Sequence, residues 1–131
     1  MNRRLFLATA ALLPGASASA QGQRSVRRIS VQDLPGVSLA GCTATMLEVT
    51  YPPNAGSEPH RHPGFVLGYV LEGAIRFGVD GGPEVVYRAG ESFYEGPGVL
   101  HTLSANASAT TPARFLAVVL AEKGAPVTTT P

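Results

Sequence analysis

The sequence has one cysteine and few charged residues, and each shortage removes a class of protein. Cys42 has no second cysteine to pair with, so the chain cannot form an internal disulfide even in an oxidising compartment. Charged residues make up 15% of the chain and hydrophobic residues 44%, which is not the composition of a disordered protein. The basic residues form no stripe along the sequence, so nucleic-acid binding is not expected.

Helical patterning and long apolar runs are also missing. No segment after the first twenty residues carries a helical hydrophobic period of useful length, and 15 glycines with 11 prolines would interrupt a helical bundle repeatedly. The apolar run from Leu5 to Leu13 is too short to span a bilayer, so no stable membrane insertion is expected. A chain of 131 residues fits a single, turn-rich domain.

The start of the chain has the pattern of an export signal. Arg3 and Arg4 precede the apolar run, and Ala18-Ser19-Ala20 supplies the small residues after which a signal peptidase cuts. We therefore predict that residues 1–20 are a cleaved signal peptide and that residues 21–131 form the mature domain, in the periplasm or secreted.

The paired arginines leave the export route open. Arg3-Arg4-Leu5-Phe6-Leu7 is similar to the twin-arginine motif, which carries folded proteins across the membrane, but two arginines also occur in ordinary secretory signals. Cleavage would remove both arginines and leave eight basic residues against nine acidic ones, so the net charge would change from +1 to −1.

The remaining sequence alternates between short apolar segments and Gly/Pro turns, which predicts many short strands in a sandwich or barrel. We expect Glu72-Gly73 to be a tight turn that makes the strands on either side of it a hairpin. The expected strands are 43–51, 65–71, 74–79, 84–87, 92–95, 100–104 and 114–121.

Three histidines are the candidates for chemistry. His60 and His62 flank Arg61, and residues two apart on a strand point to the same face, so both rings can reach one ion. His101 follows the turn Gly96-Pro97-Gly98. A lone histidine is more often a surface or core residue than a ligand, but the paired spacing favours a metal site. Imidazole ligands suit Fe, Mn, Ni, Cu or Zn better than Ca or Mg.

These segments resemble the two motifs of the cupin family. The first motif has a His-x-His pair, then a glutamate, then a glycine, and His60-Arg61-His62 and Gly73 match it in spacing. The second has a glycine, a Pro-x-Gly turn and a histidine, and Gly90, Gly98 and His101 match it.

The resemblance covers about residues 39–121, nearly the whole expected mature domain. It implies an all-β fold, a single cupin jelly-roll β-barrel of antiparallel strands. It also implies one divalent transition metal ion held by His60, His62 and His101. Cupins of this size commonly pair, so we further expect a homodimer in which the residues before Gly41 extend one sheet across the interface.

One departure from the family pattern affects the metal site directly. The motif's glutamate position is Val66, so the usual fourth ligand is missing. Three neutral imidazoles would leave the charge of the ion uncompensated and at least one coordination position open. Glu95 is a candidate replacement from another strand, although Glu91 and Glu95 can equally face solvent. Glu58 is expected to be exposed in a loop.

Three functions stay open on the sequence alone. The first is an exported metal-dependent enzyme that acts on a small organic molecule by oxygenation or isomerisation, because some three-histidine cupins are thiol dioxygenases or diketone-cleaving enzymes. The second is a ligand-binding or sensory cupin without chemistry, because no general acid or base is evident beside the histidines. The third is a metal-free jelly roll that serves only as an interaction module.

Overall fold

The computed structural model describes residues 24–36 and 38–131; the predicted signal peptide, residues 1–20, lies outside them. The described residues form nine strands and contain no helix. Within this part of the chain, therefore, there is no helix long and apolar enough to cross a membrane.

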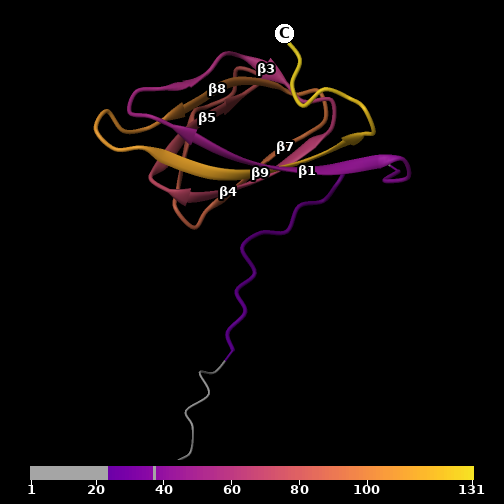
Figure 1. Cartoon of the computed structure of the whole chain (residues 1–131), viewed down its shortest axis with the longest axis horizontal. Helices are drawn as coiled ribbons and strands as arrows, with labels where there is room; N and C mark the ends of the chain where they lie inside the picture. The colour runs from indigo at the N-terminus through magenta and orange to yellow at the C-terminus, as the bar shows by residue number, and fades with distance from the viewer. Residues whose placement is uncertain (1–23, 37) are drawn as a thin grey trace, which may run out of the picture.

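The strands form two antiparallel sheets that face each other (Figure 1). The first sheet has the order β1 (Cys42–Tyr51), β9 (Ala113–Glu122), β4 (Phe65–Glu72) and β7 (Ser92–Glu95). The second has the order β2 (Gly56–Ser57), β8 (Leu100–Asn106), β5 (Ala74–Val79) and β6 (Val85–Arg88), and the short β3 (His60–Arg61) also pairs with β8. The all-β jelly-roll prediction is confirmed, although the two sheets do not close into a continuous barrel.

The core lies between the sheets because alternate residues of each strand point inward. On β9, Phe115, Ala117 and Val119 are buried while the residues between them are partly exposed. Val70 from the first sheet and Ile75 from the second are fully or almost fully buried in the same cluster. The apolar alternation in the sequence therefore decides which face of each strand is inside.

The expected hairpin between residues 65–71 and 74–79 is not formed. β4 pairs with β7 and β9, whereas β5 pairs with β6 and β8, so the chain crosses from one sheet to the other at Gly73. Gly73 has φ +70°, and a Cβ there would lie 2.7 Å from the carbonyl oxygen of Pro112. A crossing with a left-handed backbone and no room for a side chain requires glycine. A tight hairpin turn favours glycine too, so the glycine at position 73 does not distinguish the two arrangements.

The two ends of the chain behave differently. Residues 24–36 form an extended arm outside the sheets (Figure 1), where Ile29 and Ser30 share a surface hollow with Leu67, Leu116 and Val118. The C-terminal residues instead return to the domain, and their end lies next to β3 in Figure 1. Arg61 of β3 and Thr129 form an isolated antiparallel bridge there.

Candidate metal centre

Pairing between β3 and β8 brings the three histidines together. His60 lies directly opposite His101 in this ladder, and His62 follows at the end of β3. One ring nitrogen from each of the three residues lies within 4.8 Å of the other two. Ligands bonded to one ion at about 2.0–2.2 Å lie about 3–4 Å from each other, so a small contraction would place all three nitrogens around one ion.

Two local features hold His101 in position. The backbone of Leu100 is fixed by Asp80, whose carboxylate accepts from the Leu100 N–H at 3.0 Å and whose own N–H donates to the Leu100 carbonyl at 2.8 Å. The ladder between β5 and β8 shifts register between Gly78 and Val79, and Val79 is the partner of His101. Such bulges re-aim a side chain locally, and here the redirected ring packs on Phe77 at a centroid distance of 4.5 Å.

The surroundings of His60 and His62 fix which nitrogen of each ring can bind an ion. Nδ1 of His60 lies 2.8 Å from the carbonyl oxygen of Glu58, and Nδ1 of His62 lies 2.7 Å from that of Val127. A carbonyl oxygen only accepts, so each Nδ1 carries a proton, and in the neutral ring each Nε2 keeps its lone pair. Metal-bound histidines usually make this kind of contact through the other ring nitrogen, because it sets the tautomer and the ring orientation.

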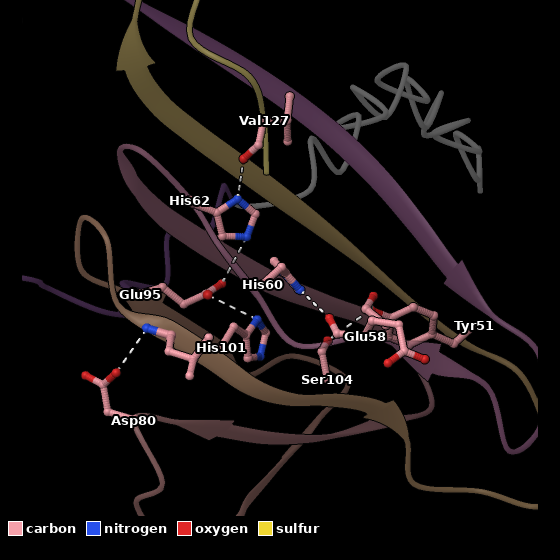
Figure 2. Close-up of polar contacts among 11 residues, drawn as sticks. Tyr51, Glu58, His60, His62, Asp80, Glu95, His101, Ser104 and Val127 are labelled. Carbon is pink, nitrogen blue, oxygen red and sulfur yellow. Dashed lines mark hydrogen bonds and ion pairs between the residues drawn. The ribbon is translucent and has the colours of Figure 1, made fainter. Parts of the chain in front are cut away.

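Glu95, the candidate replacement ligand, approaches two of the three histidines. It is directly opposite Val66 in the ladder between β4 and β7, so both side chains point to the same face of the sheet. Its carboxylate lies between two of the histidines (Figure 2), with Oε1 3.0 Å from Nδ1 of His101 and Oε2 3.8 Å from Nε2 of His62. Glu91, the other acidic candidate on this segment, is exposed and accepts from the backbone N–H of Arg88.

The buried polar atoms at this point fit a metal ion. Glu95 and His101 are only 3% and 4% exposed. Glu95 Oε1 and His101 Nδ1 lie 3.0 Å apart without forming a hydrogen bond of good geometry, and His101 Nε2 has no hydrogen-bond partner within the described part of the chain. Leaving these buried atoms without well-formed polar contacts would be costly, and a cation is a partner that serves carboxylate and imidazole together.

Burial favours the neutral form of His62. Desolvation lowers the pKa of His62 below its ordinary value, and it outweighs the opposing effects of the hydrogen bond to Val127 and of the Glu95 carboxylate. A neutral imidazole is the form that binds a metal ion, so the environment of His62 favours ligation.

The cluster lies on the wall of a partly open cavity of about 420 Å³. The rest of its lining is mainly apolar and includes Leu47, Val49, Val66, Phe93 and Phe115. No lysine or arginine lines it among the described residues. A metal ion would therefore be the only source of positive charge for a bound molecule.

A second polar group faces the same cavity. The hydroxyl of Tyr51 is hydrogen-bonded to the hydroxyls of Ser57 and Ser104, at 2.9 Å for Ser104. Tyr51 lies at the end of β1, where Asn106 fixes the backbone by donating from its amide to the Tyr51 carbonyl at 3.1 Å. Such a hydroxyl cluster can exchange protons or hydrogen bonds with a molecule in the cavity.

The structure brings His60, His62 and His101 together, with Glu95 beside His62 and His101. It also places Val66 in the same cavity, as the strand parity predicts. The side chain of Glu58 is exposed, as expected, but its carbonyl holds His60. The sequence did not mark Tyr51, Ser57 and Ser104 as lining residues, nor Val127 as the partner of His62. For Tyr51 alone a signal is present, which is its inward parity with Leu47 and Val49.

Comparison with known proteins identifies both the family and the fold. A sequence model described as the cupin domain matches residues 47–119, more than half of the chain. Curated proteins give no significant match. Similar solved structures include a cupin-like protein from Thermotoga maritima, with a TM-score of 0.59 and 18% identity over 67% of this chain and 64% of that one.

Two further similar structures have names that specify an activity. The polyketide cyclase from Streptomyces resistomycificus matches with a TM-score of 0.56 and 26% identity, over 66% of this chain and 59% of that one. A predicted oxalate decarboxylase from Thermotoga maritima matches with a TM-score of 0.51 and 28% identity, over 58% of this chain and 64% of that one. The match thus spans less than two thirds of the length of each of these three proteins.

Proposed function

This chain belongs to the cupin family, and we propose that it uses His60, His62, His101 and Glu95 to hold one divalent transition metal ion, which binds and activates a small organic molecule. The observation that carries the proposal is the convergence of one ring nitrogen from each of the three histidines, beside the buried Glu95 carboxylate and a His101 Nε2 that has no hydrogen-bond partner among the described residues. Three neutral imidazoles and one carboxylate would leave an ion with a net charge of +1.

The cavity favours one class of ligand. An apolar lining without a lysine or arginine does not suit a polyanion, which would need more than one positive partner. A molecule with an apolar body and one oxygen-rich end, such as a carboxylate, a diketone or a hydroxyketone, suits both the lining and an ion at one end. The similar polyketide cyclase and predicted oxalate decarboxylase, by their names, also act on oxygen-bearing organic molecules.

Proton transfer is the chemistry that the chain's own residues support. A bound divalent ion would polarise an oxygen of the ligand and acidify the neighbouring C–H or O–H group. The hydroxyl of Tyr51, linked to Ser57 and Ser104, is placed in the same cavity to donate or accept a hydrogen bond at the reacting end. An ion and a hydroxyl group at the same end of the ligand favour isomerisation, elimination or cyclisation. Oxygenation is the alternative reaction, and a survey of candidate reactions distinguishes them.

A non-enzymatic binding role is the second candidate. The observation in its favour is that Tyr51 is already hydrogen-bonded to both serines, so its hydroxyl can be structural. Tyr51→Phe separates the two roles. If Tyr51→Phe loses turnover but binds the ligand as tightly as the parent, a catalytic role is supported. If the parent never converts the ligand and Tyr51→Phe binds it with the same affinity, binding alone is supported.

The primary experiment measures metal stoichiometry. Metal-free protein is incubated separately with Fe, Mn, Ni, Cu or Zn, desalted and analysed for its metal content. One ion per chain, with an increase in the melting temperature, is expected, because a ligand that binds only the folded state stabilises it. If no ion is retained, the metal proposal is wrong and the metal-free interaction module becomes the leading function.

We also propose that the protein is exported after cleavage near Gln21 and that it forms a homodimer. N-terminal sequencing of the protein from its source cell tests cleavage, and recovery of Met1 would contradict it. Replacing Arg3 and Arg4 with lysine tests the twin-arginine route, because that route requires the pair. A monomeric mass in light scattering would contradict the dimer.

A further inference from the structure

The C-terminal segment beyond β9 returns to the metal site. After β9 the chain turns at Lys123 and Gly124, where Gly124 has φ +87°, and it then reaches the cavity. Residues 127–130 all line the cavity that holds the histidine cluster. We call residues 126–131 the C-terminal strap.

The strap is attached to β3 by backbone hydrogen bonds. The N–H of Arg61 donates to the carbonyl of Thr129 at 2.9 Å, and the N–H of Thr129 donates to the carbonyl of Arg61 at 2.9 Å. Because β3 has only two residues and otherwise pairs only with β8, this bridge turns an exposed edge into an internal strand. A two-residue strand with one open edge would fray more readily.

The strap also supplies the hydrogen-bond acceptor for His62. Its carbonyl at Val127 accepts from Nδ1 of His62 at 2.7 Å, as Figure 2 shows. Without this acceptor, the proton of a neutral imidazole can move to Nε2, which faces Glu95. An Nε2 that carries a proton cannot bind a metal ion, so each binding event would first require a change of tautomer.

We infer that the C-terminal strap is a positioning element of the metal site, which holds His62 in its metal-binding tautomer and keeps β3 in place. The inference rests on the proposed metal function. The strap also forms one part of the cavity wall. It is attached to the rest of the domain through backbone contacts and one partly buried side chain, Val127. Val127 is thus a positioning residue through its carbonyl group.

The test compares two shortened chains with the parent. One lacks residues 126–131 and so loses the bridge and the acceptor; the other lacks only Pro131 and keeps both. Zn²⁺ affinity is measured by competition with a chromophoric chelator. We expect a loss of roughly 10- to 100-fold for the first chain, as is usual when the hydrogen-bond partner of a metal-bound histidine is removed, and little change for the second.

A point variant covers the case in which the shorter chain fails to fold. Thr129→Pro removes the N–H that donates to Arg61, whereas Thr129→Ala keeps both backbone groups of the bridge. We expect Thr129→Pro to lose much more Zn²⁺ affinity than Thr129→Ala, with both variants folded by circular dichroism. If the chain without residues 126–131 folds, an affinity equal to that of the parent would overturn the inference; if it does not fold, equal affinities of Thr129→Pro and the parent would do so.

A second measurement does not depend on the metal. Nitrogen-15 NMR of the imidazole rings in metal-free protein should show His62 protonated at Nδ1 in the parent and a mixture of tautomers in the chain without the strap. If the parent binds no Zn²⁺ but the His62 tautomer still changes when the strap is removed, the proposed metal function is wrong and the positioning role is supported. An unchanged tautomer in the shortened chain contradicts the positioning role, whatever the metal affinity.

Discussion

Val66 of β4 and Glu95 of β7 are direct partners across an antiparallel ladder, and both side chains line the cavity that holds the three histidines. The family motif places its glutamate at the position of Val66, but here the neighbouring strand carries the carboxylate at the opposing position. Because partners in such a ladder have Cβ atoms about 5 Å apart on one face, a glutamate can reach the same space from either strand. In this chain a carboxylate therefore reaches the cavity from β7 and not from β4.

Exchanging the two residues tests this relationship. Glu95→Val should reduce metal affinity strongly, because it removes the only carboxylate close to His62 and His101 among the described residues. The double variant Val66→Glu, Glu95→Val should regain part of the loss, since it returns the carboxylate to the motif position. Zn²⁺ titration of the three proteins measures both effects. A double variant no better than Glu95→Val would show that only strand β7 can deliver the ligand.

His101→Ala should nearly abolish metal binding. It removes one of three imidazoles, so the loss should exceed the roughly 100-fold seen when an outer hydrogen-bond partner is removed. It should also remove the rise in melting temperature that metal gives the parent. Thr102→Ala is the matched control, because Thr102 is the next residue on β8 and does not line the cavity. Equal Zn²⁺ retention by the parent and His101→Ala would exclude this residue as a ligand.

The pH dependence of the metal-free protein should reflect the burial of His62. Burial lowers the pKa of His62 in the folded state, while the unfolded chain keeps a value of about 6.5. At pH below about 6.5 the unfolded chain therefore binds more protons, and the free energy of unfolding falls as pH falls toward the folded pKa. Above pH 6.5 His62 is mostly neutral in the unfolded chain as well, so its protonation no longer lowers the free energy of unfolding.

Urea unfolding between pH 5 and 8 in the presence of a chelator measures the effect. His62→Gln should show a shallower loss of stability on the acid side than the parent, because it has no group at this position to protonate. Parallel curves for the two proteins would mean that His62 titrates alike in the folded and unfolded chains.

Gly68→Ala should destabilise the fold and disturb the cavity. Gly68 faces Phe93 across the ladder between β4 and β7, and a Cβ at Gly68 would lie 2.0 Å from the tip of the Phe93 ring. Phe93 is buried among other aromatic rings, so relief requires repacking that costs about 1–3 kcal/mol. Urea unfolding measures the cost, and Gly36→Ala is the control, because a Cβ at Gly36 would meet no atom within 4 Å. Equal stability of both variants would contradict this packing.

The sequence by itself determined most of the strands and the face that each one buries. Period-2 alternation is a local property, so the inward parity of Leu47, Val49 and Tyr51 is visible without any partner strand. The same rule places His60 and His62 on one face, and it places Val66 in the cavity beside them. The two family motifs then indicate that His101 joins the pair.

The tertiary structure alone decided which strands are neighbours. The segments 65–71 and 74–79 looked like a hairpin, but they lie in different sheets, because both arrangements bury the same alternate residues and both need a glycine at position 73. Pairing depends on contacts between residues far apart in sequence, which local alternation does not specify. The approach of Glu95 to His62 and His101 depends on such a pairing, although its parity with buried Phe93 is a local hint.

The strap shows the same limit most clearly. Residues 126–131 have the composition of a polar tail, and no periodic pattern marks Val127 or Thr129 as partners of β3. Their contacts with His62 and Arg61 are made by backbone groups, which every residue other than proline carries in the same form. Side-chain identity therefore contains little information about them, and only the path of the folded chain brings them to the metal site.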